Sequence, residues 1–116
     1  MKVTDPVLRE RICEAIGDPD STKILHSIRG PPKNAQAVSE ETSIPLSSVY
    51  RKLAVLKEAG LAFVKSFEIT AEGKRQDLYI TSVLEVRIGI LGDQPEIDLV
   101  PTDESVSRIW FKLFGG

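Results

Sequence analysis

The spacing of apolar residues divides the chain into a helical part, up to about residue 60, and an extended part after it. In the first part, apolar residues recur every three or four positions, a spacing typical of amphipathic helices that pack on a core. Asp5 and Asp18 each stand before a proline, and Asn34 precedes a third stripe, so each of these side chains can cap a helix. The pattern predicts helices over residues 6–16, 19–29, 35–42 and 45–59.

After residue 60, aromatic and β-branched residues replace the helical spacing, as is typical of strands. Residues 61–69 and 76–81 are predicted to pair as a hairpin, because Gly73 between them can take the positive φ that a tight loop needs. Two basic residues, Lys74 and Arg75, follow Gly73. The hairpin is therefore expected to have a basic tip.

The rest of the chain is predicted to form two more strands, over residues 83–91 and 96–100, and a last helix that begins at about residue 102. Two helices, a short helix, a tight turn, a further helix and a basic-tipped hairpin follow one another in the order of a winged helix-turn-helix. The predicted fold class is α+β: a winged helix-turn-helix, with helices followed by a β-hairpin wing, and a C-terminal strand and helix extension.

The predicted helix over residues 45–59 has two different faces. Val49, Leu53 and Leu56 lie at positions i, i+4 and i+7, the spacing of a stripe that faces a core. The opposite face carries hydrogen-bonding and basic side chains, namely Ser47, Ser48, Arg51 and Lys52. No other predicted helix separates a core face from a hydrogen-bonding face so clearly.

Residues 38–64 (VSEETSIPLSSVYRKLAVLKEAGLAFV) resemble the core of the ArsR- and MarR-like regulators, especially the ArsR-like kind. The matching positions are Ser47-Ser48-Val49, Arg51, Leu53, Leu56 and Ala59-Gly60-Leu61. The resemblance implies a transcriptional regulator that binds double-stranded DNA sequence-specifically. In such a protein, the helix over residues 45–59 would lie in the major groove, and the wing over residues 61–81 on the backbone or in the minor groove.

The side chains predicted to contact DNA are Ser47, Ser48, Tyr50, Arg51 and Lys52 on the helix, and Lys74 and Arg75 on the wing. Serine hydroxyls at the start of a helix bind phosphates or base edges, and the helix N–H groups also favour phosphate. Arg51 is long enough to bind a guanine edge with two hydrogen bonds. The two basic wing residues would sit over the backbone or the minor groove.

The chain departs from the family pattern at Ser39, Thr42 and Ser43, where a small apolar residue, an apolar residue and the turn glycine are usual. Metal-sensing ArsR proteins need paired cysteines or clustered histidines and acids, whereas this chain has one cysteine, Cys13, and one histidine, His26. The sequence therefore predicts no metal site and no cofactor. It also contains no nucleophile motif and no Gly-rich phosphate loop, so we expect no enzymatic activity.

The charge distribution permits a DNA-binding surface without requiring one. The net charge is −2, but residues 45–81 contain six basic and four acidic residues, and residues 82–116 contain three basic and six acidic residues. Winged domains also serve as protein-docking modules of transcription complexes. In that alternative, Lys74 and Arg75 are solvated loop charges.

Aromatic residues gather in the last predicted helix, where Trp110, Phe111 and Phe114 are three of only seven in the chain. A terminal helix that is apolar on more than one side usually needs a partner, so the chain is predicted to form a homodimer through these residues. The resemblance to ArsR-like proteins, which pair through helices that flank the DNA-binding core, implies the same arrangement. Alternatively, the aromatics fold back over the wing sheet of their own chain. The expected organisation is a DNA-binding domain over residues 1–81 and a dimerisation extension over residues 82–116.

Two further observations concern the cellular setting. No apolar run approaches the roughly 18 residues that span a membrane, and the N-terminus is polar. A single cysteine suits a reducing compartment. We therefore expect a cytoplasmic protein with no membrane partner, and the sequence names no effector.

Overall fold

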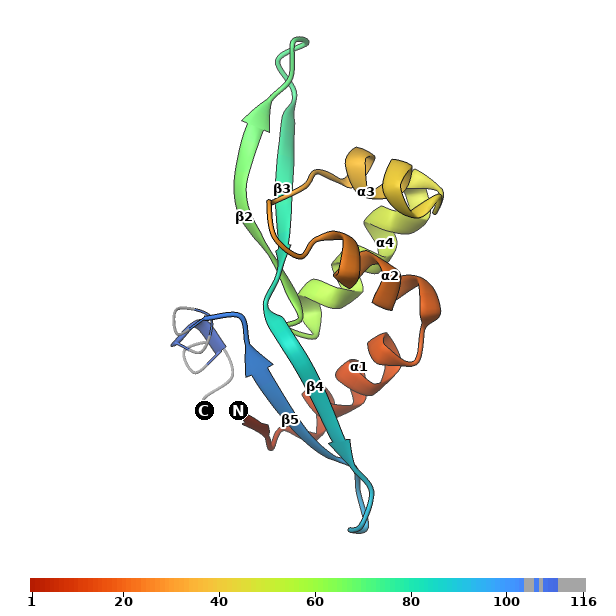
Figure 1. Cartoon of the computed structure of the whole chain (residues 1–116), viewed down its shortest axis with the longest axis vertical. Helices are drawn as coiled ribbons and strands as arrows, with labels where there is room; N and C mark the ends of the chain where they lie inside the picture. The colour runs from red at the N-terminus through yellow and green to blue at the C-terminus, as the bar shows by residue number, and fades with distance from the viewer. Residues whose placement is uncertain (104–105, 107, 111–116) are drawn as a thin grey trace.

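The computed structural model describes residues 1–103, 106 and 108–110. In chain order its elements are β1 (Lys2–Val3), α1 (Pro6–Ile16), α2 (Pro19–Ser27), α3 (Ala35–Thr42), α4 (Leu46–Glu58), β2 (Ala62–Ile69), β3 (Arg75–Thr81), β4 (Val83–Gly89) and β5 (Glu96–Pro101). Figure 1 shows the β2–β3 hairpin and the β4–β5 pair reaching to opposite ends of the molecule, with the four labelled helices along one side. The fold is an α+β winged helix-turn-helix, and the predicted C-terminal strands are β4 and β5.

The first three helices begin where their capping residues predict. Asp5 Oδ1 accepts a hydrogen bond from the backbone N–H of Val7 at 2.8 Å, and Asn34 Oδ1 accepts one from that of Ala37 at 2.8 Å. The Asp18 side chain caps α2 in the same manner. These capping bonds satisfy N–H groups that have no partner within the helix, which is why local sequence was sufficient to locate the helix starts.

The three departures from the family pattern lie in the second half of α3 and in the turn that follows it. Ser43, in the place of the usual glycine, has a left-handed φ of 61°. Ser39 Oγ donates a hydrogen bond of 2.6 Å to the carbonyl of Ile44, and Thr42 Oγ1 donates one of 2.7 Å to the carbonyl of Val38. Both hydroxyls therefore have a backbone carbonyl as partner, one in the turn and one inside α3, so polar residues are accommodated at these positions.

The wing is the antiparallel hairpin of β2 and β3, with an irregularity in register between Val64 and Ser66. Gly73 in its turn has a φ of 80°, as the sequence predicts. Lys33, in the loop between α2 and α3, forms an isolated antiparallel bridge with Tyr79 of β3, through backbone hydrogen bonds of 2.8 and 3.1 Å. This bridge attaches the helical part of the domain directly to the wing.

A second sheet, of strand order β1-β5-β4, lies beyond the wing. The sequence did not predict β1, whose Lys2 and Val3 stand opposite Asp98 and Ile97 of β5. Val3 is 4% exposed and Ile97 is fully buried, and both belong to one core cluster with the helices. The N-terminal residues therefore pair with a strand of the C-terminal extension.

Trp110 lies against the root of the wing in its own chain. Its side chain is 2% exposed, and its Nε1 donates a hydrogen bond of 2.8 Å to the carbonyl of Gly60, two residues after the end of α4. Residues 106 and 108–110 are helical, as predicted. Phe111 and Phe114, the other two residues predicted to form the dimer, lie outside the described residues.

No described helix has both the length and the apolar character needed to cross a membrane.

Candidate nucleic-acid interface

The buried residues of α4 fix the direction in which its other side chains point. Val49 and Leu56 are fully buried and Leu53 is 1% exposed, which turns the opposite face of the helix to solvent. By the period of 3.6 residues per turn, Ser47 and Arg51 lie at the centre of that outer face, and the structure exposes both. The division into two faces that the sequence predicts is therefore present.

Tyr50 lies on one flank of this face, beside the wing. It is 52% exposed and, together with residues of α3 and β3, lines a polar hollow of about 180 Å³. The other lining residues are Asn34, Gln36, Arg75, Gln76, Asp77 and Tyr79. The hollow therefore lies between α4 and the wing and borders both.

Hydrogen bonds across this hollow connect α3 to the wing. Asn34 Nδ2 donates to Glu68 Oε1 at 2.9 Å and to Gln76 Oε1 at 3.1 Å. Burial, and then the negative charge of Asp77, raises the pKa of Tyr79 above its ordinary value. Gln36 and Gln76 were not among the predicted site residues. The position of Gln36 in the first turn of α3, two residues after the capping Asn34, was the signal available for finding it.

Ser48 and Lys52 lie on the other flank of α4, toward α1 and α2. Lys52 Nζ forms an ion pair with Asp18, the residue that caps α2, and the Lys52 side chain is only 20% exposed. Arg51, Lys52 and Asp18 line a shallow groove between α4 and the first two helices. The structure thus separates Lys52 from Tyr50 and engages it with a carboxylate, whereas Arg51 remains exposed.

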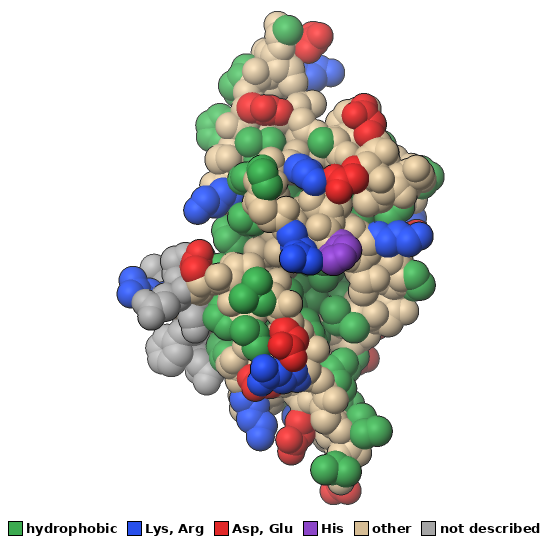
Figure 2. Space-filling model, viewed as in Figure 1, with side chains coloured by type: hydrophobic (Ala, Val, Ile, Leu, Met, Phe, Trp, Pro, Cys, Tyr) green, Lys and Arg blue, Asp and Glu red, His purple; other side chains and the backbone are tan. Residues whose placement is uncertain are grey.

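The two wing cations have different surroundings. Lys74 is exposed in the wing turn. Arg75 Nε donates to Asp77 Oδ1 at 2.9 Å, and its guanidinium lies 4.2 Å from the centre of the Phe67 ring. Figure 2 shows acidic, basic and hydrophobic side chains intermingled over the wing. The charge of Arg75 is therefore partly balanced within the wing by Asp77.

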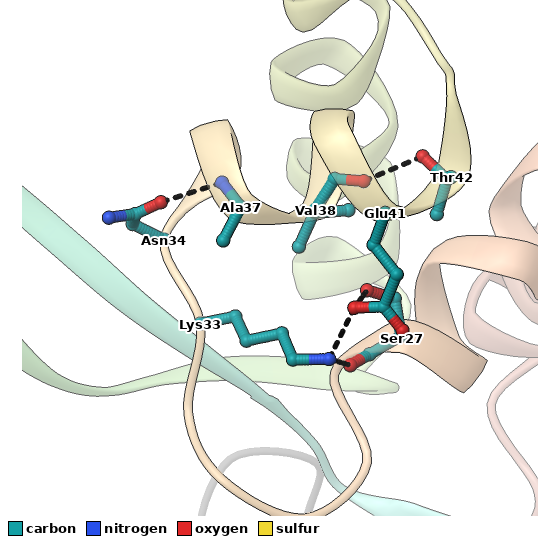
Figure 3. A network of polar contacts seen from close by, with 7 residues as sticks. All are labelled: Ser27, Lys33, Asn34, Ala37, Val38, Glu41 and Thr42. Carbon is teal, nitrogen blue, oxygen red and sulfur yellow. Dashed lines mark hydrogen bonds and ion pairs between the residues drawn. The ribbon is translucent and has the colours of Figure 1, made fainter.

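A polar network holds α3 against α2, as Figure 3 shows. Lys33 Nζ donates to the carbonyl of Ser27 at 2.6 Å and forms an ion pair with Glu41. Ser27 Oγ donates to Glu41 Oε2 at 2.9 Å. Because the backbone of Lys33 also pairs with Tyr79, this network links α2, α3 and the wing.

Ion pairing lowers the pKa of two carboxylates behind the interface. The hydrogen bond from Lys52, followed by that from Ser21, lowers the pKa of Asp18 below its ordinary value of 3.8. The hydrogen bond from Lys33, followed by that from Ser27, lowers the pKa of Glu41 below its ordinary value of 4.5. Because the pKa of each carboxyl is lower in the folded than in the unfolded chain, both ion pairs stabilise the fold fully at pH values above the unfolded-state pKa. This stabilisation is lost as the pH falls through the folded-state pKa.

We expect D18N and E41Q to flatten the dependence of stability on acid pH. At neutral pH both variants should have a lower free energy of unfolding than the wild type, and the difference should shrink as the pH falls below the ordinary carboxylate pKa values and the wild-type carboxylates take up protons. Urea denaturation at a series of pH values measures this. E72Q, in the exposed wing turn, is the matched control and should follow the wild-type curve. A constant difference between variant and wild type at all pH values would contradict the prediction.

Comparisons with known proteins assign no family to the chain. No protein-family model matches it, and no curated protein matches its sequence. Among solved structures, the chain is similar to NolR from Sinorhizobium fredii, with a TM-score of 0.45 and 15% sequence identity over 97% of this chain and 93% of that chain. The geometry of α4 and the wing therefore carries the functional argument.

Proposed function

We propose that this protein binds double-stranded DNA sequence-specifically and regulates transcription. One observation carries the proposal: the outer face of α4, with Ser47 and Arg51, continues through Tyr50 into the wing strand β3. A hydrogen-bonding helix face of this kind fits the major groove, and a hairpin beside it reaches the adjacent backbone or the minor groove. We infer no enzymatic activity for this surface.

The start of α4 supports a phosphate contact. Its N-cap is Pro45, and no side chain accepts a hydrogen bond from the first N–H groups of the helix. Such N–H groups attract anions, and the hydroxyls of Ser47 and Ser48 are in the first turn beside them. In the proposed complex a DNA phosphate takes the place of the missing cap.

The remaining proposed contacts divide into those that specify sequence and those that position the protein. Arg51 would bind a guanine edge in the major groove. Tyr50 would contact the DNA on the flank of α4 nearest the wing. Lys74 and Arg75 would neutralise phosphates. Lys52 stays a predicted contact, and its ion pair with Asp18 favours a supporting role that orients α4 on α2.

R51A and K74A are expected to weaken DNA binding in different ways. R51A should cost about 1–3 kcal/mol at one base position and relax specificity there. K74A should lower the affinity for all duplex sequences alike. It should also reduce, by about one, the slope with which the logarithm of the binding constant falls against the logarithm of the salt concentration. Selection from a randomised duplex pool, followed by fluorescence anisotropy on the selected and on scrambled duplexes at several salt concentrations, measures both. K23A, an exposed lysine of α2, is the control. If the pool yields no retained duplex at low or moderate salt, the proposed function is wrong.

A protein-docking role is the second candidate, and the wing supplies the observation in its favour. Phe67 is 52% exposed and Ile69 is 61% exposed on β2, an unusual apolar surface for a strand that faces a phosphate backbone. Glu68 and Glu72 add negative charge near them. Failure of the duplex selection would make this surface the first to test with protein partners.

Three sequence-based predictions about organisation remain proposals. The division into residues 1–81 and 82–116 separates the proposed DNA contacts from the strands that follow. A homodimer that forms through Trp110, Phe111 and Phe114 is a further proposal. The burial of Trp110 in its own chain argues against it. A cytoplasmic location suits a protein of this proposed activity.

A further inference from the structure

Strand β4 lies at the edge of the second sheet and has one neighbour, β5. Its other edge pairs with no strand of the described residues. Apolar side chains line up along it: Leu84 is 68% exposed, Ile88 is 43% exposed and Ile90, just beyond the strand, is 80% exposed. An open strand edge with exposed apolar side chains is a ready site for the addition of another strand.

A groove runs beside the first half of this edge. Its volume is about 310 Å³, and it lies between β4 and the facing sides of α1 and α2. Leu84 and Val86 form one wall, and Ile16 and Leu25 contribute apolar surface from the helices. The groove therefore offers room beside Leu84 for an apolar side chain from an added strand.

The charges of β4 alternate in a self-complementary order. Glu85 and Arg87 are on the face of the strand opposite to that of Val86, and within one chain they pair at 2.7 Å. If two β4 strands pair antiparallel about a two-fold axis at Val86, Glu85 of each copy stands opposite Arg87 of the other. The same register places Ile88 of each copy near Leu84 of the other, which lies at the irregularity in β4 between Val83 and Glu85. Figure 2 shows acidic and basic side chains side by side in the region of the second sheet, with hydrophobic side chains around them.

We propose that β4 is a self-association surface whose partner is β4 of a second copy of this chain. A two-fold interface requires each surface to complement itself, and the order Glu85, Val86, Arg87 does so in the regular part of β4, with exposed Leu84 and Ile88 on either side of it. The result is one six-stranded sheet, in the order β1-β5-β4-β4-β5-β1. This inference concerns assembly and does not depend on DNA binding.

Charge reversal on the full-length chain tests the proposed register. E85R places arginines opposite each other across the two-fold axis, and R87E does the same with glutamates. The dimer dissociation constant of each single variant should therefore be about tenfold or more above that of the wild type. An equimolar mixture of the two variants pairs Arg with Glu at both positions and should restore dimers. Sedimentation equilibrium at micromolar to hundred-micromolar concentrations measures the three samples, with K23E as the control.

A second variant leaves the charges untouched. L84K places a charged side chain near Ile88 of the partner while changing a residue that is already 68% exposed, so the fold should persist as the dimer weakens. Circular dichroism on every variant checks folding. A wild-type chain that stays monomeric up to hundreds of micromolar overturns the proposal. So does a dimer that neither the single reversals nor L84K weaken, which would point to the terminal aromatics.

Discussion

Replacing Trp110 with alanine is expected to lower the free energy of unfolding by about 3–5 kcal/mol, among the largest losses for any single substitution in this chain. The side chain is 2% exposed, and with Val106 it closes the core over the root of the wing. An open pocket of about 350 Å³ already lies beside it, lined by Phe63, Val64 and Ile109 among others. Removing the indole would enlarge this pocket, because surrounding side chains relax only partly into the space.

W110F separates packing from hydrogen bonding at the same position. Phenylalanine retains most of the ring but loses Nε1, which donates to the carbonyl of Gly60. Ser82 Oγ donates to the same carbonyl at 2.5 Å, so this oxygen keeps one partner. The hydrogen-bond part of the W110F loss should therefore be only about 1 kcal/mol. Urea denaturation of wild type, W110A and W110F gives the comparison.

The result also bears on the predicted homodimer. If W110A is within about 1 kcal/mol of the wild type, Trp110 is not seated in its own core, since truncating a buried tryptophan costs far more. The side chain would then be available to a second copy, as the aromatic content of the terminal helix predicts. A loss of the expected size supports the alternative, in which this aromatic folds back over the wing sheet of its own chain.

Sequence was sufficient for those elements whose signals are local. Asp5, Asp18 and Asn34 each bond N–H groups two or three residues away, so the helix starts follow from neighbouring residues alone. The wing turn depends on Gly73, again a local requirement. The core stripe of α4 was predictable because helical periodicity decides which residues share a face.

Features that depend on distant segments were not predictable in this way. The two residues of β1 show no alternation long enough to indicate a strand, and their partners are in β5, at the other end of the chain. Lys52 and Asp18 meet only because α2 and α4 cross where they do, so the side chain that seemed free for DNA is engaged in an ion pair. The polar hollow beside Tyr50 likewise combines three elements, and no local pattern brings them together.

Leu53 provides the second large effect and separates the structural face of α4 from its proposed DNA-binding face. It is 1% exposed among buried residues of the core, and L53A should lower the free energy of unfolding by about 2–5 kcal/mol through lost burial and a residual cavity. R51A, on the outer face of the same helix, should change stability by no more than about 0.5 kcal/mol. Urea denaturation of the two variants measures this difference.

DNA binding should show the reverse order. Under conditions where L53A is still folded, its affinity for the selected duplex should stay near that of the wild type, because Ser47, Tyr50 and Arg51 keep their positions on the outer face. R51A should lose affinity while keeping its stability. The two assays together distinguish a contact from a core residue, since a substitution that acts only through unfolding changes the folded fraction and not the affinity of folded molecules. If folded L53A binds as weakly as R51A, α4 shifts when its core face is truncated, and the outer face cannot be treated as independent of the packing beneath it.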